Sequence, residues 1–136
     1  MSAVRPRALN LWCFLRFSVV GVVGFTVDGG TLQALIKLAD WGPVEARAVA
    51  VPIAVLATWM LNRYVTFRDV GNVPAFRSLA RYATVSGVGA AVNFSVYGCL
   101  VFGSSAMAAE PLVPLAMASI AALIFNFLGS THFAFR

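Results

Sequence analysis

The sequence predicts an all-α membrane protein with four transmembrane helices, built from two tandem helical-hairpin repeats. The composition is the first reason: of the 136 residues, 60% are hydrophobic and only 11% are charged. Such a chain has too little polar surface to cover a water-soluble globule of its size. The second reason is that each apolar stretch approaches the roughly 20 residues that an α-helix needs to cross a bilayer. The third reason is an internal repeat.

The repeat appears as short blocks that recur at a nearly constant spacing. Arg16-Phe17 reappears as Arg81-Tyr82, an offset of 65 positions (81 − 16). Toward the end of each copy the offset becomes 68 (135 − 67), where Phe67 is matched by Phe135. We therefore expect one transmembrane domain over 1–136, with repeat one at 12–68 and repeat two at 77–136.

The four helices are expected at 12–38, 44–66, 80–103 and 111–134. Within the first, the apolar run contains a single charge, Asp28. Arg5 and Arg7 precede this run as they would in a signal peptide. Since the run is long and a small-residue cleavage site is missing, we expect an uncleaved helix.

The basic residues predict the orientation in the membrane. Lys37 and Arg47 are the two basic residues on one side, whereas the remaining basic residues flank the start, the central loop and the end: Arg5, Arg7, Arg16, Arg63, Arg68, Arg77, Arg81 and Arg136. The positive-inside rule puts both termini and the central loop in the cytoplasm of a multi-pass inner-membrane protein. The basic excess is thus an orientation signal, and we expect no nucleic-acid partner.

The sequence offers little for covalent chemistry. Cys13 and Cys99 are expected at opposite depths of the bilayer and therefore unpaired. His132 is the only histidine and stands apart from any cluster of metal-ligand residues. We expect no metal, no cofactor and no enzyme active site.

Polar residues inside the predicted spans form the first candidate site. Asp28 is the main one, because an exposed carboxylate at that depth costs roughly 2.5–3.5 kcal/mol, so it should face the interior of the bundle. It could accept a proton, bind an ion or a sugar, or serve as a hydrogen-bonded packing residue. The other polar residues are Gln33, Thr58, Asn93 and Asn126. Their amides and hydroxyls suit carbohydrate hydroxyls, and they suit helix–helix contacts equally well.

Arginines at the cytoplasmic membrane surface form the second candidate site. The four expected at similar depth are Arg16, Arg63, Arg68 and Arg81. Guanidinium groups suit the paired oxygens of a phosphate. The alternative is that these arginines only anchor the helix ends at the interface.

One block resembles a known family. Asn62-Arg63-Tyr64-Val65-Thr66-Phe67, preceded by Thr58-Trp59, resembles the N-R-x-W-T-F signature of the GtrA-like family of small four-helix membrane proteins, with Val65 where tryptophan is commoner. The opening block from Arg16 to Gly21 and the closing block from Thr131 to Phe135 are similar to that family as well. The likeness covers nearly the whole chain from Arg16 onward.

The resemblance implies a function in cell-surface polysaccharide synthesis. The family is thought to move polyprenyl-phosphate-linked sugars from the cytoplasmic to the outer leaflet. By this likeness the phosphate would meet Arg16, Arg63 and Arg81, and the sugar would follow a polar path past Asn62, Asn93, Asn126 and Asp28. The implied partners are the lipid-linked sugar, a membrane glycosyltransferase and a second copy of the chain. The sequence has no nucleotide-binding motif, so a substrate gradient or an ion or proton must drive movement.

Two other functions stay open. One is a non-transporting adaptor that recruits a polyprenyl-phosphate glycosyltransferase to the membrane. The other is a small multidrug-type exporter, which also has four short helices and one buried carboxylate. That design places its carboxylate near the start of the first helix, whereas Asp28 is deeper, and the basic rim suits an anionic lipid better than a cation.

Overall fold

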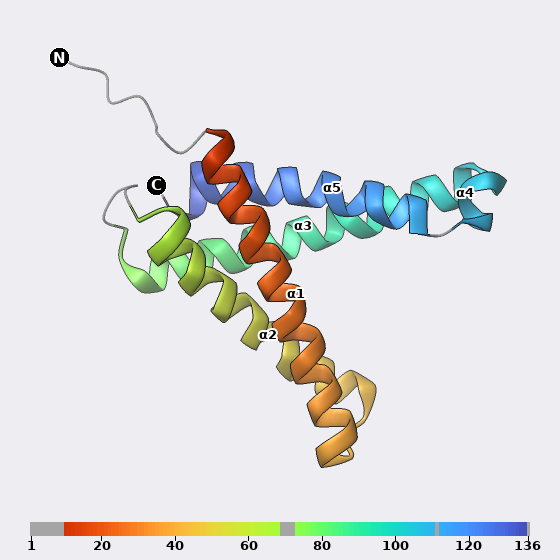
Figure 1. Ribbon diagram of the computed structural model, residues 1–136, viewed down its shortest axis with the longest axis horizontal. Coiled ribbons are helices and arrows are strands. Elements are labelled where there is room, and N and C mark those ends of the chain that lie inside the picture. The colour runs from red at the N-terminus through yellow and green to blue at the C-terminus, as the bar shows by residue number, and fades with distance from the viewer. Residues whose placement is uncertain (1–9, 69–72, 111, 136) are drawn as a thin grey trace. The chain divides into compact units, whose positions relative to one another are not determined.

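The computed structural model describes residues 10–68, 73–110 and 112–135 (Figure 1). The chain divides into two compact units, Met1–Asn72 and Val73–Arg136. Arg5, Arg7 and Arg136, which contribute to the orientation argument, lie outside the described residues, as does position 111, the expected start of the fourth helix.

Unit 1 is an antiparallel helical hairpin. Its elements are α1 (Leu11–Ala39), α2 (Pro43–Leu61) and a short π-helical turn, η1 (Asn62–Thr66). The α1 helix begins where the Asn10 side chain accepts a hydrogen bond from the Cys13 backbone N–H at 2.7 Å. It ends at Asp40, which adopts a left-handed conformation with φ 54° and donates its N–H to the Leu35 carbonyl.

Unit 2 is a second hairpin of the same kind. Its elements are α3 (Ala75–Gly103), the short α4 (Ser105–Ala109), α5 (Leu112–Gly129) and a second π-helical turn, η2 (Ser130–Ala134). In this unit α3 packs against both α5 and η2.

The all-helical membrane fold predicted from the sequence is confirmed. Among the described residues, four helical segments are long and apolar enough to cross a membrane: Leu11–Ala39, Glu45–Thr66, Ala75–Gly103 and Val113–Ala134. The third begins before the expected residue 80, because Arg77 and Ser78 continue the helix past the apolar run. At 29 residues, α1 and α3 are each about 43 Å long, so they extend beyond a ~30 Å hydrocarbon core or cross it at a tilt.

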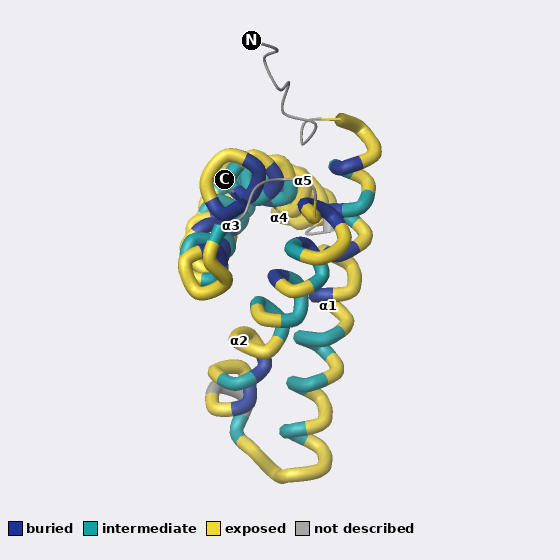
Figure 2. The backbone as a smooth tube through the Cα atoms, turned by 90° about the vertical axis from the view of Figure 1, so that its left-hand side faces the viewer, coloured by how far each residue is buried: buried dark blue, intermediate teal, exposed yellow. Residues whose placement is uncertain are grey.

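The same face is buried in the first helix of both units. In α1 the buried residues are Cys13, Phe17, Val20 and Gly24, a spacing of three and four that marks one helix face. In α3 they are Ser78, Tyr82, Val85 and Gly89, each 65 positions later (78 − 13, 89 − 24). This match supports the interpretation of a tandem repeat. Figure 2 shows buried segments interrupting otherwise exposed helices, as expected when lipid covers the outer faces.

The first helix of each unit is less tightly packed in its second half. No residue of α1 after Gly24, and none of α3 after Gly89, is fully buried. Asp28 and Asn93 both lie in these less buried halves.

Candidate functional site

Two arginines in unit 1 stack on tryptophan rings. The Arg16 guanidinium lies 5.5 Å from the centroid of the Trp12 ring, and the Arg63 guanidinium lies 5.7 Å from that of Trp59. In each of these arginine–tryptophan stacks the arginine follows its tryptophan by four positions, which places both on one helix face. A guanidinium over an indole ring is attracted by the π face of the ring, and its fork of N–H donors suits phosphate oxygens.

The π-helical turn η1 fixes the position of Arg63. Asn62 is only 1% exposed, and its side-chain oxygen accepts a hydrogen bond from the Thr66 hydroxyl at 2.9 Å. The Phe67 N–H closes the wide turn by donating to the Asn62 carbonyl at 2.8 Å. Asn62 was predicted on a sugar path; in this conformation its amide is buried and helps to build the turn.

Contacts with α1 hold this turn against the rest of unit 1. The rings of Phe17 and Phe67 lie 6.0 Å apart at 58°, a tilted aromatic pair. The Cys13 thiol lies 3.7 Å from the Thr66 carbonyl oxygen. The end of the hairpin that carries both arginine–tryptophan stacks is therefore well packed.

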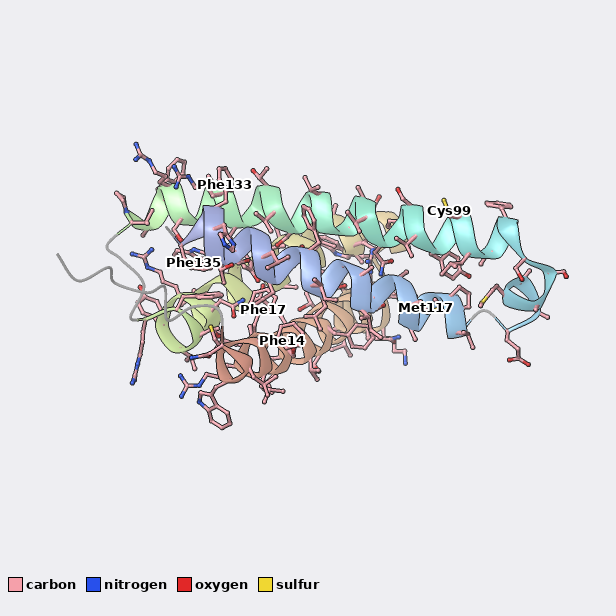
Figure 3. All side chains as sticks on the ribbon, turned by 90° about the horizontal axis from the view of Figure 1, so that it is seen from above. Phe14, Phe17, Cys99, Met117, Phe133 and Phe135 are labelled. Atoms are coloured by element: carbon pink, nitrogen blue, oxygen red, sulfur yellow. The ribbon has the colours of Figure 1, made fainter. Side chains whose placement is uncertain are left out.

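Unit 2 repeats this geometry with different side chains. The Phe135 N–H closes η2 on the Ser130 carbonyl at 3.1 Å, and the rings of Tyr82 and Phe135 lie 5.9 Å apart at 58°. Figure 3 labels Phe17 of the first aromatic pair and Phe135 of the second. Arg81 lies 5.0 Å from the centroid of the Phe133 ring and donates to the Phe133 carbonyl at 3.2 Å. Arg81 is thus tied to η2 through the backbone as well as through the ring.

The two units have matched close contacts between their helices. A methyl group added at Gly24 would meet the Thr58 side chain, and one added at Gly89 would meet the Asn126 amide, 2.6 Å from its Cγ. The Thr58 hydroxyl donates within its own helix, at 2.9 Å from the Ala54 carbonyl. The Asn126 side-chain oxygen is buried, and no donor among the described residues reaches it. The Thr58 hydroxyl thus has a partner for its proton, whereas the Asn126 oxygen has no described donor.

Asp28 is paired with Arg47. The two side chains meet at 3.4 Å between Arg47 Nη1 and Asp28 Oδ2, joining α1 to α2. The second carboxylate oxygen, Oδ1, is buried, and no donor from the described part of the chain reaches it. Sequence reasoning missed Arg47 as a site residue. The available signal was its position near the start of the second predicted helix, which a hairpin places beside the second half of the first helix.

Asn93 occupies the corresponding place in unit 2. Its amide nitrogen donates to the Ser119 hydroxyl at 3.4 Å, which joins α3 to α5. Ser119 was also missed, because a serine in an apolar run gives no separate signal. The remaining predicted residues are not gathered with these: Gln33 and Arg68 are exposed.

The comparison with known proteins identifies the family. The model of the GtrA/DPMS transmembrane domain matches residues 16–136, nearly the whole chain. The chain belongs to the GtrA/DPMS transmembrane-domain family. This membership and the four candidate spans make the GtrA/DPMS chain a multi-pass membrane protein and support involvement in polyprenyl-phosphate sugar metabolism.

A curated relative of this GtrA/DPMS chain is a much longer protein. It is a dolichol-phosphate mannosyltransferase from Pyrococcus furiosus, 33% identical over 89 residues. The aligned part is 65% of this chain and 25% of the relative. The GtrA/DPMS chain therefore corresponds to about a quarter of that mannosyltransferase.

Proposed function

We propose that this protein flips a polyprenyl-phosphate-linked sugar from the cytoplasmic to the outer leaflet of the inner membrane, for cell-surface polysaccharide or glycan modification. The observation that carries the proposal is the pair of arginine–tryptophan stacks at one end of unit 1. They hold two guanidinium groups near the membrane surface, where an anionic lipid headgroup lies. With the arginine-based topology, this end faces the cytoplasm.

The phosphate is the group that these arginines recognise. Arg16 and Arg63 present fork-shaped donors, and a charge-assisted hydrogen bond to phosphate is roughly twice as strong as a neutral one. By the arginine-based topology, the exposed Arg68 of unit 1 and Arg81, held on η2 of unit 2, also lie on the cytoplasmic side of the membrane. The polyprenyl tail stays in lipid, so only the headgroup needs a protein surface.

The sugar hydroxyls then pass polar side chains inside the spans. Asp28, Asn93 and Asn126 lie deeper in the helices, and the side-chain oxygens of Asp28 and Asn126 include acceptors that no described donor uses. Replacing water by such groups lowers the cost of carrying hydroxyls through hydrocarbon, which is several kcal/mol for each unpaired polar group. The step needs no covalent chemistry, and we expect a homo-oligomer without catalytic activity of its own.

A second candidate function is favoured by the curated relative. In the Pyrococcus furiosus protein, a segment similar to this chain is part of a dolichol-phosphate mannosyltransferase. Since one polypeptide combines the two, a separate chain of this family could recruit a membrane glycosyltransferase instead of moving its product. As an adaptor it would act through its lipid-facing helix surfaces.

Translocation in proteoliposomes separates the two functions. We expect the native chain to move a fluorescent polyprenyl-phosphate sugar between leaflets, and Arg63→Ala to reduce the rate at least about tenfold, since a charged hydrogen bond is worth 1.5–3 kcal/mol. The matched control is Arg77→Ala, which removes an exposed arginine outside the arginine–tryptophan stacks.

Two results would argue against flipping. Equal rates for Arg63→Ala and Arg77→Ala would remove the phosphate role from Arg63. No movement by the native chain under any substrate, ion or proton gradient, together with co-purification of a glycosyltransferase, would favour the adaptor.

A further inference from the structure

Unit 1 carries arginines near both ends of its hairpin. Arg63 follows Arg47 by 16 positions along α2 and η1 (63 − 47), a helical rise of about 24 Å. This is close to the ~30 Å thickness of the hydrocarbon core. The arginine–tryptophan stacks involve the arginines at one end of the hairpin. They do not explain the role of Arg47 at the other end.

The ion pair of Asp28 and Arg47 has unused hydrogen-bonding groups on both sides. The Arg47 side chain is 58% exposed and meets Asp28 through one nitrogen, whereas a guanidinium has five N–H donors. The Asp28 side chain is 20% exposed, and its Oδ1 atom has no donor among the described residues. Donors that suit an anion therefore lie beside an acceptor that suits a hydroxyl.

The second unit shows that helix pairing at this depth does not require charge. Asn93 corresponds to Asp28 (28 + 65), and it joins α3 to α5 through a neutral hydrogen bond to Ser119. Leu115 stands at the position that corresponds to Arg47 (47 + 68). A neutral pair joins the helices without the free-energy cost of placing charges inside a membrane span. The charged pair of unit 1 is therefore expected to do more than join helices.

We propose that Asp28 and Arg47 form a second headgroup site for a phosphate-linked sugar, at the end of the hairpin opposite the arginine–tryptophan stacks. The Arg47 guanidinium binds phosphate oxygens, and the partly exposed Asp28 carboxylate, whose buried Oδ1 atom has no described donor, accepts a hydrogen bond from a sugar hydroxyl. The proposal rests on the proposed function and topology, by which this end faces the outer leaflet and releases the headgroup.

The resident carboxylate keeps this site weak enough for release. Asp28 already occupies one side of the guanidinium, so an arriving phosphate shares Arg47 with an anion that is part of the protein. A transport site must bind strongly enough to be entered and weakly enough to be left. The arginines at the other end have aromatic rings as neighbours in their stacks, which do not repel a phosphate.

Binding measurements in nanodiscs test the site without requiring transport. The probes are a short-chain fluorescent polyprenyl-phosphate sugar and the same polyprenyl phosphate without sugar, used in an Arg16→Ala/Arg63→Ala background that removes the first site. We expect Arg47→Gln to weaken binding of both probes about tenfold or more. The matched control is Lys37→Gln, which removes an exposed basic residue at the same end of the hairpin and should leave affinity unchanged.

Asp28→Asn tests the sugar half of the site. This variant should lower the affinity for the sugar-bearing probe. The affinity for the probe without sugar should stay the same or increase. The helix pairing should survive, because unit 2 has asparagine at the corresponding position. Equal affinities for Arg47→Gln and Lys37→Gln would overturn the proposal, as would equal effects of Asp28→Asn on both probes.

Chemical protection of the unmodified chain is the second measurement. Phenylglyoxal modifies exposed arginines, and bound probe should slow modification of Arg47 while leaving the control Arg77 unaffected. Lack of protection at Arg47 would overturn the site even if the variants failed to fold. If Arg47 binds the probe but the native chain never translocates it, the second site stands and the flipping function falls.

Discussion

Gly129→Ala should loosen the contact between α5 and α3. A methyl group at Gly129 would lie 2.7 Å from Val85 Cγ1, 3.1 Å from Cγ2 and 3.5 Å from Cβ. Both branches of the valine are in the way, so rotating its side chain exchanges one clash for another, and the helices must separate instead. Overpacking of this kind costs about 1–3 kcal/mol.

The matched control is Gly87→Ala, which has the same change in composition and, apart from the neighbouring backbone of its own helix, no described atom within 4 Å of the added methyl group. Alanine is favoured over glycine in a helix by roughly 1 kcal/mol at both positions. Comparing the two variants removes this common gain, so Gly129→Ala should be less stable than Gly87→Ala by the overpacking cost alone.

The assay is SDS-induced unfolding in mixed micelles, followed by far-ultraviolet circular dichroism. Val85→Ala combined with Gly129→Ala should recover part of the loss, because the double variant removes both clashing methyl groups. If Gly129→Ala proves as stable as Gly87→Ala, the helices are farther apart than described and the reasoning is wrong.

The remaining predictions concern unit 1 and the two thiols. In detergent, the exposed Cys99 should react with N-ethylmaleimide at least about tenfold faster than Cys13, because Cys13 is buried beside the Thr66 carbonyl. Mass spectrometry measures the two rates. Equal rates would contradict the packing of η1 on α1. Asn62→Ala should lower the free energy of unfolding by about 1–3 kcal/mol, because it leaves the buried Thr66 hydroxyl without its acceptor. Combining it with Thr66→Val should recover part of that loss in the same denaturation assay, and an unchanged stability of Asn62→Ala would refute the role of this bond.

The helices could be predicted from the sequence, because apolar runs of membrane length follow from composition alone. The limits of that reasoning appear at Ala75, where α3 begins earlier than expected. A helix continues as long as its backbone can hydrogen-bond, so Arg77 and Ser78 extend it past the point where the apolar run stops. The short helix α4 (Ser105–Ala109) was missed because five residues carry too little periodicity to recognise.

The candidate site was harder to predict than the fold. Asp28 was singled out because a charge in an apolar span needs a partner, but the partner, Arg47, could not be chosen among the basic residues. Which side chains meet depends on helix rotation and crossing, and sequence spacing fixes neither between two helices. The burial of Asn62 could not be predicted for the same reason. It depends on the π-helical turn η1, which no sequence pattern indicated.

The π-helical turns also decide which side chain reaches the neighbouring helix. A π turn holds one residue more than an α turn, and each residue of a helix points about 100° away from the previous one. In register terms, η1 and η2 each absorb the equivalent of a one-residue insertion, so that Phe67 and Phe135 meet Phe17 and Tyr82. Removing one residue from either turn would leave an ordinary helical turn with the aromatic ring still facing the neighbouring helix, whereas converting the intact turn to α-helix would rotate the ring by about 100° away from its partner.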